Sequence, residues 1–140
     1  MSESFPISVP SRPPQRGMRL LFAACFGFAA VLLGAFGAHA LKATLLLHGT
    51  REVWQTAVQY HFVHVLVLLF LGLDEGAPCW IGAAFASGII LFSGSLYLLA
   101  LTGAAWLGPI TPLGGLAFLV GWGGLALHGW RLAQKEKSRP

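Results

Sequence analysis

The chain has 140 residues, of which 56% are hydrophobic and only 10% are charged. A soluble domain averages about 25% charged residues, so this chain lacks the polar surface that would face water on all sides. Two cysteines are too few for a disulfide-rich scaffold, and the apolar content excludes disorder for most of the chain. The composition therefore predicts a protein that crosses a membrane several times.

Residues 1–17 contain four prolines, which prevent a regular helix, and we expect a flexible tail there. Arg16 and Arg19 precede an apolar run that ends at Ala38-His39-Ala40, a pattern that also occurs in cleavable signal peptides. The run has no charged residue from 20 to 41. It exceeds the roughly 7 to 15 apolar residues of a signal peptide, so a retained membrane helix is favoured.

Three stretches without Asp, Glu, Lys or Arg place the membrane helices, at residues 20–41, 53–73 and 76–130. About 20 apolar residues span the hydrocarbon core as a helix, so the first two stretches hold one crossing each. The third is long enough for two, with Gly103, Gly108 and Pro109 supplying the turn. The sequence therefore predicts an all-α, integral membrane four-helix bundle over residues 18–131. The expected helices are 18–41, 54–73, 80–102 and 110–131, followed by a basic tail at 132–140.

Basic residues predict the orientation of the chain in the membrane. With four crossings both termini lie on one side, and seven Lys and Arg residues flank them, against two in the loop at 42–53. Cytoplasmic segments carry the excess of Lys and Arg, so both termini are expected to be cytoplasmic. The net charge of +4 does not indicate nucleic-acid binding, because these residues flank membrane segments without interleaved aromatics. We expect them to contact anionic membrane lipids.

Small residues recur three or four positions apart in the predicted helices, where they allow close helix packing. Two interpretations are open: packing within the bundle, or docking of a second copy or another membrane protein. The main series are Ala23, Gly27, Ala30, Gly34 and Ala38 in the first helix, Gly82, Ala84, Ala86 and Gly88 in the third, and Gly114, Ala117, Gly121 and Gly124 in the fourth.

Histidines are the ionisable residues expected at membrane depth, where such groups indicate function by default. His61 and His64 are three residues apart and share a helix face, and His39 lies near the outer end of the first helix. If His39 meets His61, the group can, together with His64, ligate a metal or haem. The alternatives are neutral histidines hydrogen-bonded between helices, and histidines that carry protons. No haem-attachment or zinc motif accompanies them, so no cofactor or metal is expected. The candidate polar cluster is His39, Gln59, Tyr60, His61 and His64.

Ser93 and Ser95 have no neighbouring base in sequence, and no carboxylate lies within a predicted helix. Nucleophilic catalysis and ion-coupled transport are therefore disfavoured, and we do not expect an enzyme.

Four motifs in chain order resemble the YgdD/YwdK-like family of small inner-membrane proteins. They are Leu33-Gly34-Ala35-Phe36-Gly37-Ala38-His39, Tyr60-x-x-x-His64, Leu91-Phe92-Ser93-Gly94-Ser95-Leu96-Tyr97, and Thr111-Pro112-x-Gly114-Gly115 through Gly121-Trp122. The resemblance spans roughly residues 18 to 131 and implies a four-helix integral membrane protein of unknown function, without an established substrate or cofactor. It also implies a bacterial inner membrane, or the mitochondrial inner membrane, because the family includes a small mitochondrial protein.

Two functions are expected at this point. The first is a non-enzymatic accessory protein that packs with itself or with other membrane proteins. The second is binding or transport of a small solute, lipid or quinone through His39, Gln59, Tyr60 and His64. A haem or metal carrier is a third, weaker alternative.

Overall fold

The computed structural model describes residues 15–138, and this part of the chain contains helices and no strands. The elements are α1 (Gln15–Ala38), α2 (Lys42–Leu47), α3 (Arg51–Leu73), α4 (Cys79–Gly88), the π-helical turn η1 (Ile89–Ser93), α5 (Gly94–Thr102), the 3-10 turn η2 (Ala105–Leu107) and α6 (Ile110–Lys137). Because α4, η1 and α5 are continuous, they form one long helix. The structure thus has four helices long and apolar enough to cross a membrane, and the all-α prediction is confirmed.

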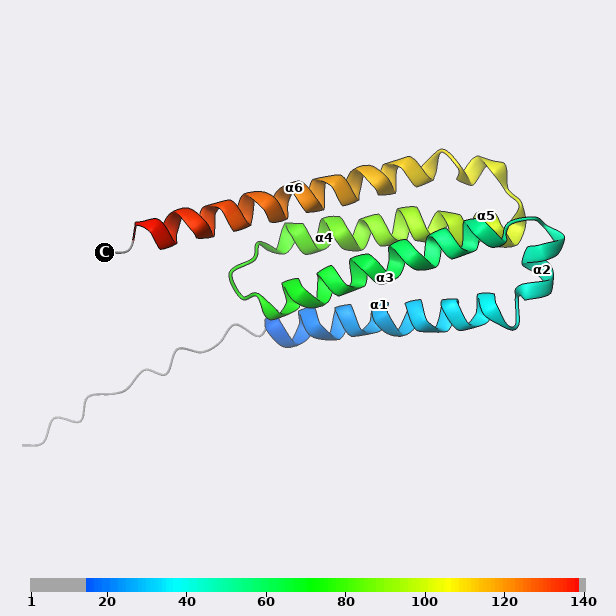
Figure 1. Ribbon diagram of the computed structural model, residues 1–140, viewed down its shortest axis with the longest axis horizontal. Coiled ribbons are helices and arrows are strands. Elements are labelled where there is room, and N and C mark those ends of the chain that lie inside the picture. Colours follow the sequence, from blue (N-terminus) through cyan, green and yellow to red (C-terminus); the bar gives the residue numbers. More distant parts are fainter. Residues whose placement is uncertain (1–14, 139–140) are drawn as a thin grey trace, which may run out of the picture.

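The four long helices lie side by side in the order α1, α3, α4–α5 and α6 (Figure 1). Within the described residues, α1 packs on α3 and α2. Its backbone stays away from α4, α5 and α6, although Arg19 donates a hydrogen bond to Cys79 at the start of α4. The N-terminus of α1, the α3–α4 turn and the C-terminal part of α6 lie at one end, which we call the charged end. The other end, with α2 and η2, is called the α2 end.

Two hydrophobic clusters hold this row of helices together. One surrounds Phe85 and Ile81 of α4, which are fully buried against α3 and α6. The second lies toward the α2 end and contains Trp54, Tyr97 and Leu45. Leu45 is 1% exposed, and its burial explains why residues 42–47 form a helix where a loop was expected.

The start of α3 and the end of α6 extend beyond the expected ends for a common reason. Charge-free stretches mark the segment inside hydrocarbon, whereas a helix continues into the headgroup layer, where charges are solvated. Thus α3 begins at Arg51 instead of 54, and α6 runs through Lys137, so most of the expected C-terminal tail is helical. The first helix begins at Gln15 and ends at Ala38 instead of 41. Residues 1–14 of the expected N-terminal tail lie outside the described residues.

Small residues make the close contacts between these helices. Ala23 and Ala30 are buried, and Gly27 and Gly34 approach Val65 and Val58 of α3. In α6, three glycines pack on the α4–α5 helix: Gly114 on Phe92, Gly121 on Phe85, and Gly124 on Trp80. Most members of the series in α1 and α6 therefore pack within the chain.

Candidate functional site

An aromatic cluster fills the space between α3 and α6, and we define it as Tyr60, His64, Phe85, Phe92, Phe118 and Trp122. The His64 ring stacks on Phe118 with centroids 3.5 Å apart and planes 7° apart. Tyr60 stacks on Phe92 at 4.4 Å, and Phe85 meets Trp122 edge-on at 5.4 Å. The predicted pair Tyr60 and His64 is thus brought together.

Both ring nitrogens of His64 have partners. Its Nδ1 lies 2.8 Å from the carbonyl oxygen of Tyr60, and the indole N–H of Trp122 donates to its Nε2 at 3.3 Å. A carbonyl oxygen can only accept and an indole N–H can only donate. The geometry therefore fits one neutral tautomer, with the proton on Nδ1 and the Nε2 lone pair already used.

His61 lies one turn before His64 but faces different helices. Its Nδ1 is 3.4 Å from the Tyr97 hydroxyl of α5, and its ring meets Phe26 of α1. Its Nε2 is buried without a hydrogen-bond partner in the described part of the chain, as is Oγ of Ser93. The two histidines therefore pack separately instead of forming one site.

His39 and Gln59 do not join these histidines. Gly37 packs on Trp54, which sets the register of α1 against α3. His61 lies seven residues beyond Trp54, roughly 10 Å along the axis, so His39 and His61 do not meet. His39 is exposed just after α1, and Gln59 is exposed on α3. Over residues 15–138, no three His, Cys, Asp or Glu side chains are placed to hold a metal ion.

The remaining motif positions divide into packing and exposed residues. Ser95 and Thr111 lie 2.8 Å apart through their hydroxyls and link α5 to α6. A Cβ on Gly94 or Gly115 would meet nothing closer than 4.0 Å. Phe36 and Pro112 are exposed.

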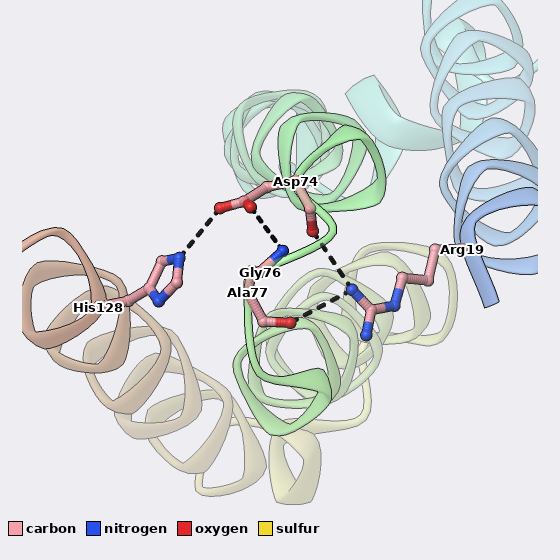
Figure 2. A network of polar contacts seen from close by, with 5 residues as sticks. All are labelled: Arg19, Asp74, Gly76, Ala77 and His128. Carbon is pink, nitrogen blue, oxygen red and sulfur yellow. Dashed lines mark hydrogen bonds and ion pairs between the residues drawn. The ribbon is translucent and has the colours of Figure 1, made fainter. Parts of the chain in front are cut away.

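A polar network at the charged end was not predicted (Figure 2). Asp74, at the end of α3, lies 3.0 Å from Nε2 of His128 on α6 and accepts from the N–H of Gly76. Arg19 of α1 donates to the carbonyl oxygens of Asp74 and Ala77, at 3.4 and 3.2 Å. The α3–α4 turn is thereby tied to both outer helices. The sequence held one signal: Asp74 follows the second expected helix and His128 lies near the end of the fourth, and with four crossings both positions fall on the same side of the membrane.

Four long apolar helices, joined by hydrogen bonds between their few polar side chains, define a polytopic α-helical membrane protein. The family described as "Protein of unknown function (DUF423)" matches residues 33–115, and the chain belongs to this family. It is 41% identical to the UPF0382 inner membrane protein YgdD of Escherichia coli (strain K12) over 126 residues, covering 85% of this chain and 94% of the relative. It is 47% identical to the UPF0382 membrane protein YwdK of Bacillus subtilis (strain 168) over 100 residues, covering 66% and 80%.

These relatives confirm the predicted family and its bacterial inner-membrane location, and they give the mitochondrial alternative no support. No activity appears in their names, in accordance with a family of unknown function. No solved structure matches the chain.

Proposed function

We propose that this chain is a non-enzymatic accessory protein of the bacterial inner membrane. It associates with a second copy of itself or with another membrane protein through the half of α3 nearer the α2 end. The proposal rests on one observation, the position of Gln59.

Gln59 presents a polar amide on the outside of the structure at membrane depth. With 23 residues, α3 is about 34 Å long, little more than the hydrocarbon core of roughly 30 Å. Gln59 lies about 12 Å from Arg51 along the axis and therefore inside the core. Its side chain is exposed, and within residues 15–138 it makes no hydrogen bond.

An amide in hydrocarbon is costly unless another group satisfies it. Polar side chains such as Gln therefore promote association of membrane helices by hydrogen bonding across the interface. Gln55, one turn earlier, is exposed as well and extends the polar face toward the α2 end. A neighbouring helix on this face would satisfy both amides.

A binding or transport role through the predicted polar cluster has less support, because His39 and Gln59 lie apart from His64. A haem or metal carrier has less support too, since the Nε2 lone pair of His64 accepts from Trp122. Because both ring nitrogens of His64 already have hydrogen-bond partners, neither is available for acid–base catalysis, which supports a non-enzymatic function.

The test is the mass of the protein extracted with its surrounding lipid into polymer nanodiscs. We expect the wild type to run above the 14.9 kDa of one chain, with a second copy or a partner attached, and Gln59→Leu to run as a single chain. Gln134→Leu, the same change at the exposed end of α6, is the control and should keep the complex. A wild-type monomer, or a complex that survives Gln59→Leu, contradicts the proposal.

A further inference from the structure

A groove opens at the charged end between α1 and α4, with α3 as its floor. Helices α1 and α4 each pack on α3, but their backbones do not approach one another, and Arg19 reaches across to Cys79 at the end of the bundle, so a space stays open between them. It forms a cavity of about 340 Å³. We call it the α1–α4 groove, and its apolar lining includes Phe22, Ala23, Leu68, Gly72, Gly82 and Ala86.

Arg19 lines the same groove and brings a permanent positive charge to it. Hydrogen bonds to the carbonyl oxygens of Asp74 and Ala77 fix the guanidinium over the α3–α4 turn (Figure 2). Arg19 also donates to Sγ of Cys79 at 2.7 Å, so several hydrogen bonds hold the guanidinium in place beside the groove. The groove thus has an apolar body and a cation at the end of the bundle, where the headgroup layer begins.

We propose that the α1–α4 groove binds one anionic phospholipid, with an acyl chain along α3 and the phosphate headgroup at Arg19. The cavity lies within the roughly 300 to 1,000 Å³ typical of small-molecule sites. An anionic amphiphile matches both the apolar lining and the charge of Arg19. A zwitterionic lipid matches the lining too, but the cation of its headgroup opposes the charge of Arg19, so it is held more weakly.

Gly82 keeps the groove open and offers a direct test. A Cβ at this position would meet only Cδ2 of Leu68, at 4.0 Å, so a larger side chain enters the groove without moving backbone. Gly82→Leu should therefore fill the groove and leave the fold intact. A Cβ on Gly123 of α6 would meet nothing within 4 Å, and this glycine lies outside the groove, so Gly123→Leu is a matched control.

The experiment titrates the purified full chain in mild detergent with phosphatidylglycerol or phosphatidylcholine of the same acyl chains, and native mass spectrometry counts bound lipid. We expect the wild type to bind one phosphatidylglycerol about fivefold more tightly than phosphatidylcholine, as one basic residue at a membrane surface provides. Gly82→Leu should lose this tight binding, and Gly123→Leu should keep it. Arg19→Gln should bind both lipids equally.

Equal binding of the two lipids by the wild type would overturn the proposal, as would unchanged phosphatidylglycerol binding in Gly82→Leu. A dimer that Gly82→Leu dissociates would show instead that a second copy occupies the groove. Gln59 lies outside the groove, so Gln59→Leu should keep the lipid. Failure of this proposal is therefore distinguishable from failure of the proposed association.

Discussion

His64 of α3 and Phe118 of α6 lie face to face, with ring centroids 3.5 Å apart. Across the described residues, the backbones of α3 and α6 do not contact one another, so side chains of the aromatic cluster bridge the two helices. The Trp122 N–H reinforces this bridge by donating to His64. The membrane-embedded histidine therefore acts as a packing and hydrogen-bonding element.

Replacing His64 should separate its two contributions. His64→Ala removes the stack and leaves a cavity, and we expect a loss of about 3 kcal/mol in the free energy of unfolding. His64→Phe keeps a ring but leaves the Trp122 N–H unpaired, so a smaller loss of about 1 to 2 kcal/mol is expected. Unfolding of the purified protein in detergent measures both. Wild-type stability for His64→Ala would contradict the packing role.

Gly114 and Gly115 are neighbours with opposite expected tolerance. A Cβ on Gly114 would lie 2.7 Å from Cα of Phe92, so α6 would have to move away from the α4–α5 helix. We expect Gly114→Ala to destabilise the protein by about 2 kcal/mol or more. Gly115→Ala meets nothing closer than 4.0 Å and should stabilise the helix by up to about 1 kcal/mol. Thermal unfolding of the two variants measures both changes. Equal shifts in unfolding temperature for Gly114→Ala and Gly115→Ala would rule out the close contact between Gly114 and Phe92.

The arrangement of the helices was predictable in part. Charge-free stretches located all four crossings because charges are excluded from hydrocarbon. The short helix α2 was missed because it depends on Leu45 packing against residues distant in sequence, such as Tyr97. The π-helical turn at Ile89–Ser93 was missed as well, since no residue in it breaks a helix.

The aromatic cluster around His64 was less predictable, because the spacing of residues along one helix does not show which residues of another helix they contact. Spacing placed His61 and His64 on one face, yet the first turns toward Tyr97 and the second toward Phe118. The sequence placed Gln59 in a membrane helix, but only the packing of α1 and of the α4–α5 helix against α3 shows that its amide faces outward.

Ser93 and Ser95 make a second informative pair. Oγ of Ser93 is buried without a partner in the described part of the chain, so Ser93→Ala removes an unpaired polar group. We expect it to be neutral or stabilising. Ser95→Ala breaks the 2.8 Å hydrogen bond to Thr111 and should cost about 1 kcal/mol. If Ser93→Ala lowers the unfolding temperature more than Ser95→Ala does, Oγ of Ser93 has a hydrogen-bond partner outside the described residues, and this prediction is wrong.

Both termini are predicted to be cytoplasmic. The charged end carries Arg16, Arg19 and Arg131 together with Lys135 and Lys137, whereas the α2 end carries Lys42 and Arg51. The excess of basic residues favours the cytoplasm for the charged end. A C-terminal green fluorescent protein fusion should therefore fluoresce, and a C-terminal alkaline phosphatase fusion should be inactive. The reverse pattern would overturn this orientation.

The central claim is that the polar face of α3 at Gln59 contacts another protein. Val63 is exposed one turn from Gln59, and Phe28 is exposed on α1. A photo-crosslinking amino acid at each position, activated in living cells, tests the claim most directly. We predict a crosslinked protein band, either a second copy or a partner, from position 63 and none from position 28. Crosslinks to lipid alone from position 63 would contradict the account.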